Sequence, residues 1–114
     1  MLQYPLEIII PVYNEGENIN QVFDQLQKRV KVKFRVLLCF DHDDDSTLSS
    51  YDEKNYGFEI IAVKNKGIGA HGAIMTGMNY SNSKCIIVFP ADDVINQNII
   101  DDMYQKFVDG SKIC

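Results

Sequence analysis

Carboxylate side chains are concentrated at two points of this sequence, each directly after an apolar run. The run 36–40 is followed by Asp41, Asp43, Asp44 and Asp45, and the run 85–91 is followed by Asp92 and Asp93. Like charges this close repel one another, so they persist where water, a cation or hydrogen-bond donors meet them. Paired carboxylates suit Mg²⁺ or Mn²⁺, which take oxygen ligands and leave coordination positions open for substrate phosphates. The pattern predicts a site for a divalent metal and a phosphate-containing ligand.

A third polar cluster and a glycine-rich loop extend this pattern. The cluster Tyr13-Asn14-Glu15 follows the apolar run 8–12, and the loop holds Gly67 and Gly69 ahead of a predicted helix. Glycine amides at a helix start are open to a diphosphate, because no Cβ blocks the approach. The strands of an open parallel sheet end at one edge, which is where such sheets bind ligands. Together these features predict a metal-bridged nucleoside diphosphate.

Each acidic group also has a purely structural interpretation. Asp92 and Asp93 precede a predicted helix, where carboxylates complement the positive end of the helix dipole. The acids 43–45 are compatible with a solvated turn or with helix capping. His71 is expected to start a helix rather than bind metal, because no second His or Cys lies at a metal-ligand spacing from it. The residues alone leave these alternatives open.

Strand and helix patterns alternate along the chain. Short apolar runs predict strands at 7–12, 34–40, 58–63 and 86–89. Helices are predicted at 70–81 and 97–109, with a weak one at 47–55 and a first one carrying the apolar positions Ile19, Val22, Phe23, Leu26 and Val30. The last helix is expected to bury Ile99, Ile100, Met103, Tyr104, Phe107 and Val108. Strands alternating with helices predict a doubly wound, mostly parallel α/β sheet of Rossmann-like type.

The ends of these elements carry further predictions. Asn14 and Glu17 have the spacing of a capping box for the first helix. Gly57 is expected to stop the weak helix, and Gly110 to form the C-cap of the last one. Residues 111–114 are predicted to begin a fifth strand.

Composition narrows the class of protein. The 114 residues hold 11 Lys and Arg against 16 Asp and Glu, a net charge of −5, which argues against binding nucleic acid or anionic membranes through bulk charge. The three cysteines form no C-x-x-C pair, so buried thiols in a reducing compartment are expected. The longest apolar runs are far below the roughly 20 residues that a membrane span needs. We therefore expect one soluble, cytoplasmic domain.

Four motifs carry a family resemblance. They are I-I-I-P-V-Y-N-E at 8–15, F-D-H-D-D-D-S-T at 40–47, N-K-G-I-G-A at 65–70 and F-P-A-D-D at 89–93. Their order and spacing resemble those of the inverting family 2 glycosyltransferases with the GT-A fold, and the acid loop looks most like the dolichyl-phosphate-sugar synthase-like branch. The resemblance covers nearly the whole chain. It implies hexosyl transfer from a nucleoside-diphosphate sugar to a saccharide or polyprenyl phosphate acceptor.

The resemblance also implies roles for individual residues. The nucleotide-binding set would be Pro11, Tyr13, Glu15, Asp41, Asp43, Asn65, Gly67, Gly69 and Asp92. Within it, Asp41 would bond the base, Glu15 would lie near the ribose or base, and Asn65 to Gly69 near the diphosphate or sugar. Asp92 and Asp93 fall on the D-x-D region, with Pro90 in place of its usual leading Asp, so they would hold Mg²⁺ or Mn²⁺. Of the two, Asp93 is favoured as the ligand.

The same resemblance places the catalytic base beyond Cys114. Residues 1–114 are therefore expected to be the nucleotide-sugar-binding part of a transferase domain, catalytically incomplete by itself. The full-length protein is expected to work in the cytoplasm, in association with the inner face of the membrane. Apolar surface left exposed by the missing part would favour self-association.

Three alternatives remain at this point. Gly67, Gly69 and Gly72 satisfy G-x-G-x-x-G, and Asp92 lies 20 residues further on, as in an NAD(P)-binding Rossmann domain. Against this, three residues separate Val63 from Gly67, whereas the dinucleotide turn needs glycine directly at the strand end. A D-x-D-x-T phosphatase motif fits 43–47 but not its strand-end position. The third alternative is a nucleotide-binding module without catalysis.

Overall fold

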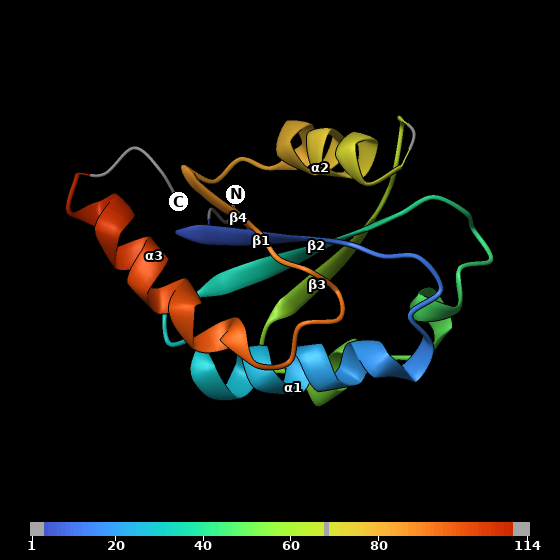
Figure 1. The fold of residues 1–114 in the computed structure, drawn as a ribbon, viewed down its shortest axis with the longest axis horizontal. Helices are drawn as coiled ribbons and strands as arrows, with labels where there is room; N and C mark the ends of the chain where they lie inside the picture. Colours follow the sequence, from blue (N-terminus) through green and yellow to red (C-terminus); the bar gives the residue numbers. More distant parts are fainter. Residues whose placement is uncertain (1–3, 68, 111–114) are drawn as a thin grey trace.

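The residues that the structure describes form one four-stranded sheet with all strands parallel (Figure 1). This computed structural model describes residues 4–67 and 69–110. The strands are β1 (Leu6–Pro11), β2 (Phe34–Phe40), β3 (Glu59–Lys64) and β4 (Cys85–Val88), in the order β3-β2-β1-β4. In register, Ile8 of β1 lies beside Val36 of β2 and Ile87 of β4. β1 therefore occupies the centre, between β2 and β4.

Helices cover both faces of the sheet, which confirms the doubly wound fold. Figure 1 shows α1 (Ile19–Arg29) and α3 (Ile99–Val108) on one face and α2 (Gly69–Tyr80) on the other. β1 and β2 are apolar at nearly every position because both of their faces are buried. Gly77 brings α2 close to the sheet, since a Cβ there would lie 2.9 Å from Ile9 Cδ1. The cluster beneath α2 contains Ile9, Leu37, Cys39, Val63 and Ala73.

Several predicted boundaries differ from the structure. The predicted capping box is wrong: α1 begins at Ile19 after a 3₁₀ turn at Gly16–Asn18, and the Asn14 side chain accepts a hydrogen bond from Ser46 N instead. The predicted helix 47–55 is two 3₁₀ turns, Ser46–Ser49 and Glu53–Asn55. Asp45 and Asp52 each cap one of these turns, and Asp, Ser and Thr side chains favour such caps and turns because they compete for backbone hydrogen bonds.

The C-terminal elements also shift slightly. A 3₁₀ turn at Asn96–Asn98 precedes α3, and Gly110 follows the helix with a φ of +107°, as expected of a C-terminal glycine. Ile100 is buried as predicted, but Ile99 and Val108 are 43% and 55% exposed, because they lie outside the face of α3 that packs against the core through Ile100, Met103, Tyr104 and Phe107. β3 and β4 are displaced by one residue from their predicted bounds. The predicted fifth strand at 111–114 lies outside the described residues.

A buried ion pair joins the amino ends of β1 and β2. Glu7 is fully buried, and its Oε2 accepts hydrogen bonds from Arg35 Nε at 2.9 Å and Nη2 at 2.5 Å. Its Oε1 accepts from Ser81 Oγ at 2.6 Å and from the amides of Asn82 and Ser83. Burial alone would raise the pKa of Glu7, but the bonds from Ser81 and Arg35 outweigh it and lower that pKa. Glu7 thus fixes the turn between α2 and β4 onto β1.

Cys39 and Cys85 are both buried, as predicted, and burial raises the pKa of the Cys39 thiol to about 11. Across residues 4–67 and 69–110, no helix combines the length and apolar character needed to cross a membrane.

Candidate functional site

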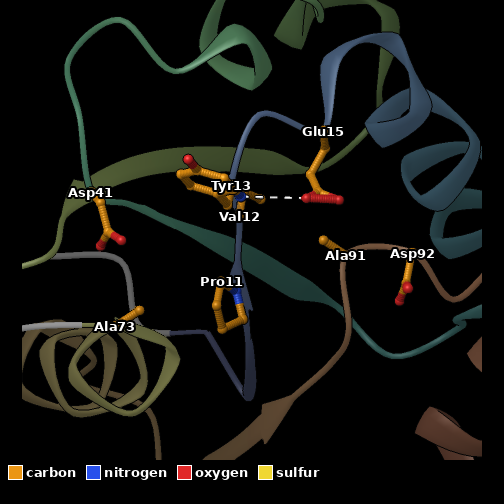
Figure 2. Close-up of a pocket in the computed structure, with 9 residues that line it drawn as sticks. Pro11, Val12, Tyr13, Glu15, Asp41, Ala73, Ala91 and Asp92 are labelled. Atoms are coloured by element: carbon orange, nitrogen blue, oxygen red, sulfur yellow. Dashed lines mark hydrogen bonds between the residues drawn. The ribbon is translucent and has the colours of Figure 1, made fainter.

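A pocket of about 420 Å³ lies at the carboxyl edge of the sheet (Figure 2). Its walls come from the ends of β1, β2 and β4 and from the first turn of α2. The lining residues are Pro11, Val12, Tyr13, Glu15, Asp41, Gly69, Ala73, Ala91 and Asp92. Three polar clusters that are far apart in sequence therefore meet at one edge, where the strand order brings them together.

Asp41 and Asp92 flank the end of β1 from its two sides. Asp41 is the first residue after β2 and Asp92 follows β4, and β1 runs between those strands. Figure 2 shows the two carboxylates on opposite sides of the segment from Pro11 to Tyr13. Tyr13 is 65% exposed, and its amide donates a hydrogen bond to Glu15 Oε2 at 3.3 Å. The pocket thus presents a carboxylate at each side and an aromatic ring between them.

Asp45 ties the loop after β1 to the loop after β2. It is only 5% exposed, and its carboxylate accepts hydrogen bonds from Asn14 N at 3.0 Å and Thr47 N at 2.8 Å. Thr47 Oγ1 in turn accepts from Glu15 N at 2.9 Å. Burial acts to raise the pKa of Asp45, but the bonds from Thr47 and Asn14 outweigh it, so the pKa lies below its ordinary value. This network sets the path of the loop that carries Tyr13 and Glu15.

The left-handed backbone of Asn14 belongs to the same network. Asn14 has a φ of +48°, which is uncommon outside glycine but is tolerated by asparagine. Its amide and side-chain oxygen are both held by the acid loop, through Asp45 and Ser46 N. Asp45 also caps the 3₁₀ turn Ser46–Ser49 through Thr47 N, which confirms the predicted capping role for this member of the acid loop.

Asp43, which the resemblance adds to the nucleotide-binding set, lies outside the pocket lining. Its Oδ2 forms an ion pair with Lys64 Nζ at 3.2 Å, and the two side chains are 79% and 55% exposed. An exposed pair of this kind contributes little to stability. Asp43 therefore has the environment of a solvated loop residue.

The loop after β3 turns its polar side chain inward. Asn65 is 8% exposed, and its Nδ2 donates to Asp41 Oδ1 at 2.6 Å and to Gly69 O at 3.0 Å. Gly67 lies against Gly72, where an added Cβ would come within 2.9 Å of the Gly67 carbonyl carbon. Gly69 has a φ of +69°, lines the pocket and begins α2. Of the predicted loop residues, Gly69 reaches the pocket, while Asn65 and Gly67 support it from behind.

The two acids after β4 have different surroundings. Asp92 is exposed and lines the pocket. Asp93 does not line it: its Oδ1 accepts from the amides of Ile95 and Asn96, both at 2.9 Å, and its Oδ2 accepts from Asn96 Nδ2 at 2.8 Å. Hydrogen bonds from the side chain and amide of Asn96 and from the Ile95 amide lower the pKa of Asp93. Asp93 therefore closes a local turn with Ile95 and Asn96 ahead of α3, and Asp92 keeps its carboxylate toward the pocket.

The donor set fits a metal ion that is shared with a ligand. Among the residues described, no group of three or more His, Cys, Asp or Glu side chains could hold a metal ion. Mg²⁺ commonly uses one or two carboxylates and completes its coordination with water and substrate phosphates. The exposed Asp92 suits that arrangement, and within residues 4–67 and 69–110 a metal cage built from protein ligands alone does not form.

Ala73 and Ala91 line the pocket although sequence reasoning assigned them no role in it. Ala73 lies on the inner face of α2, and Ala91 directly precedes Asp92. Neither methyl group has chemistry of its own, but each leaves room that a larger side chain would fill. The small residue ahead of the acid pair in F-P-A-D-D was the available signal for Ala91.

The fold resembles those of solved structures that contain nucleotide sugars. The S. aureus TarS 1–349 structure in complex with UDP-GlcNAc has a TM-score of 0.70 and 19% identity, covering 95% of this chain and 31% of TarS. The mannosyltransferase PcManGT from Pyrobaculum calidifontis, in complex with GDP-Man and Mn²⁺, has a TM-score of 0.68 and 16% identity, covering 87% of this chain and 30% of that one. At these identities the likeness establishes a GT-A type of fold.

Proteins with similar sequences are also named as transferases. The uncharacterized glycosyltransferase YaiP of Escherichia coli K12 is 32% identical over 79% of this chain and 23% of its own length. An undecaprenyl-phosphate 4-deoxy-4-formamido-L-arabinose transferase of Proteus mirabilis is 28% identical over 76% of this chain and 28% of its length. The chain thus spans about a quarter of these relatives. The Glycosyl transferase family 2 model matches residues 7–114, and the chain, with its GT-A fold and strand-end carboxylates, belongs to that family.

Proposed function

We propose that the pocket binds the nucleoside diphosphate part of a nucleotide-sugar donor, in a protein that transfers the sugar to an acceptor. The observation that carries this proposal is the placement of Asp41 and Asp92 on the two sides of the β1 end, within one pocket of about 420 Å³. One carboxylate suits the N–H groups of a base, and the other suits the cationic partner of a diphosphate. The pocket between them spans both parts of the ligand.

The base half of the proposed site is formed by β1 and β2. An ionised Asp41 accepts hydrogen bonds only, so it recognises a base edge that presents an N–H group. The exposed ring of Tyr13 and the ring of Pro11 offer apolar surface against which a base lies flat. Glu15 stands at the same loop, within reach of ribose hydroxyls in this proposal.

The diphosphate half is formed by α2 and the segment after β4. Gly69 begins the 12-residue helix α2 at the pocket wall, and the positive end of a helix dipole favours phosphate groups. Asp92 would hold Mg²⁺ or Mn²⁺, and Asp93 would support it from the adjacent turn. The metal ion, when bound, neutralises phosphate charge and so makes the nucleoside diphosphate a better leaving group.

The acceptor is proposed from the relatives rather than from the pocket. The Proteus mirabilis relative is named as a transferase to undecaprenyl phosphate, and the PcManGT structure contains GDP-Man with Mn²⁺. The first supports a polyprenyl phosphate acceptor for the whole protein, with a saccharide as the alternative, and the second supports a nucleotide-sugar donor used with a divalent metal. A cytoplasmic location at the membrane face, with buried thiols kept reduced, belongs to the same proposal.

Calorimetric titration tests the donor site directly. UDP, GDP and CDP are titrated into the chain with Mn²⁺, with Mg²⁺ and with EDTA. We expect one of the diphosphates to bind, and binding to weaken at least tenfold in EDTA. NADH binding that is independent of metal would contradict the proposal and favour a dinucleotide site. Release of free nucleotide from a nucleotide sugar by the full-length protein separates a transferase from a module that only binds, and residues 1–114 alone should release none because the expected catalytic base lies outside them.

We also propose that two copies of the chain associate with each other. β4 lies at the edge of the sheet in the described part of the chain, so one row of its backbone groups is open to another strand. Val88 on this strand is 40% exposed, and the nearby Ile95 is 75% exposed. Sedimentation velocity over a concentration series should show a dimer, and Val88→Lys should remove it. A monomer at every concentration would contradict this.

A further inference from the structure

We infer that Asn65 is a positioning residue for Asp41: it occupies one carboxylate oxygen and leaves the other for the ligand. This inference rests on the proposed function, because it assigns how the base-binding carboxylate of that site is held. It differs from the nucleotide-binding role near the diphosphate or sugar that the family resemblance implies for Asn65.

The hydrogen bonds of Asn65 use its whole side-chain amide. Nδ2 donates both of its hydrogens, to Asp41 Oδ1 and to Gly69 O. Oδ1 accepts from Gly67 N at 2.8 Å and from Thr76 Oγ1 at 3.2 Å. An asparagine amide offers two donors and two acceptor sites, so none remains for a ligand. The 8% exposure of Asn65 agrees with this inward orientation.

Chemistry decides which way round this amide lies. A carboxylate and a carbonyl are acceptors, so Nδ2 faces Asp41 and Gly69. A backbone N–H is a donor, so Oδ1 faces Gly67. Flipping the amide would set oxygen against oxygen and N–H against N–H, and this makes the observed orientation strongly preferred.

The asparagine is itself held from two elements. Its backbone N–H donates to Phe40 O at 2.7 Å. Phe40 is the last residue of β2 and directly precedes Asp41. Thr76 of α2 donates to the Asn65 side chain and accepts from Lys66 N at 3.0 Å, so the loop is anchored to the helix. Asn65 therefore relays the position of α2 to the carboxylate at the end of β2.

The consequence for Asp41 is an asymmetric carboxylate. Oδ1 is committed to Asn65 at 2.6 Å, and within the described part of the chain Oδ2 has no hydrogen-bond partner. Asp41 lines the pocket, so Oδ2 is the atom available to a base N–H. Fixing the carboxylate before the ligand arrives reduces the ordering cost of binding.

Asn65→Asp tests the inference, because it replaces the donor with a second carboxylate beside Asp41. Two carboxylates at this distance share a proton, and the pair repels when both are ionised. With the diphosphate that the parent binds most tightly, we expect variant affinity to approach the parent value at pH 5 and to fall at least tenfold below it by pH 8. His42, Asp43 and Lys64 near Asp41 are present in both proteins, so the ratio to the parent isolates position 65. Asn79→Asp, on the exposed side of α2, is the matched control.

A second measurement needs no ligand and keeps the two proposals separable. In the parent, the side-chain amide resonances of Asn65 should report the hydrogen bond to Asp41 Oδ1, and Asp41→Ala should shift them. Thr76→Val should shift the same resonances, because it removes a hydrogen bond to Oδ1. The inference would be overturned if substituting Asp41 left the Asn65 resonances unchanged, or if the Asn65→Asp variant had the same pH dependence of affinity as the parent. A parent that binds no diphosphate but shows the coupled resonances contradicts only the proposed function.

Discussion

Each end of the sheet holds a carboxylate, Glu7 within β1 at the amino end and Asp41 next to β1 at the carboxyl end, and the two differ in how completely they are hydrogen-bonded. Glu7 at the amino end is fully buried, and both of its oxygens accept hydrogen bonds from Arg35 or from the turn before β4. Asp41 at the carboxyl end is partly exposed in a pocket and receives one hydrogen bond, from Asn65, in the described part of the chain.

This difference separates a carboxylate that stabilises the fold from one that is available to a ligand. A buried charge is tolerated only when it is paired and hydrogen-bonded, so Glu7 has no capacity left. A half-bonded carboxylate in a concave site keeps that capacity, at the cost of weaker anchoring. The same contrast recurs inside the acid loop, between the buried Asp45 and the exposed Asp43.

The largest expected effect comes from breaking the amino-end pair. Glu7→Gln leaves the Arg35 charge largely buried without its main partner, so we expect the free energy of unfolding to fall by about 3–5 kcal/mol. Urea denaturation measures this. Glu59→Gln is the matched control: Glu59 contacts Arg35 Nη1 at 3.5 Å with a 40% exposed side chain, and its loss should cost less than about 1 kcal/mol. Equal losses in the two variants would show that burial does not distinguish these partners.

The second effect is on ligand affinity at the carboxyl end. Asp41→Asn removes a charged acceptor from the pocket, and we expect diphosphate affinity to fall about 10- to 100-fold, or roughly 1.4–2.8 kcal/mol. Stability should change by less than about 1 kcal/mol, because Asp41 is partly exposed. Calorimetry measures affinity, with Asp43→Asn as the control that keeps the parent value within about twofold. A comparable loss in the Asp43 variant would move the binding role along the loop.

The sheet and its ligand-binding edge were predictable because parallel strands and strand ends follow general rules. β1 and β2 are covered on both faces, so they are almost continuously apolar and recognisable as strands. Asp41, Asp92 and Tyr13 follow strand ends directly, and ends of parallel strands converge whatever the details of the loops.

Which of the acidic residues are buried and which face the pocket was not predictable, because it depends on contacts between segments that are distant in sequence. Asp45 is buried through its bond to Asn14, which lies 31 residues away in sequence, and nothing in D-H-D-D-D marks the third aspartate after Asp41 as the inward one. Glu7 sits inside an apolar strand pattern, and its partner Arg35 is 28 residues away. The predicted capping box is wrong for the same reason: Asn14 forms its hydrogen bonds with Asp45 and Ser46 of the acid loop, so its side chain does not cap α1.

The third effect joins stability to the pocket through Asp45. Asp45→Asn removes the charge that accepts from Asn14 N and Thr47 N, and we expect a loss of about 1–2 kcal/mol and a diphosphate affinity a few-fold weaker. Because folding lowers the pKa of Asp45, its contribution is fully present above the ordinary Asp pKa of about 4 and is lost as the pH falls through the lower folded value. The gap in melting temperature between parent and variant should therefore close as the pH is lowered from 6 to 3. A gap that is independent of pH would assign the effect to packing.

The smallest effect separates the two acids after β4, which sequence reasoning treated as a pair. Asp93→Ala removes the hydrogen bonds that close the local turn ahead of α3, so it should cost about 0.5–1 kcal/mol of stability while Mn²⁺ still strengthens diphosphate binding. Asp92→Ala, at an exposed position, should change stability by less than about 0.5 kcal/mol and abolish the strengthening by Mn²⁺. Melting curves and titrations with and without Mn²⁺ on both variants provide the comparison. If Asp93→Ala lost the Mn²⁺ effect and Asp92→Ala kept it, the hydrogen-bonded carboxylate of Asp93 would be the metal ligand. Complete hydrogen bonding would then no longer distinguish carboxylates that stabilise the fold from carboxylates that bind ligands at this edge of the sheet.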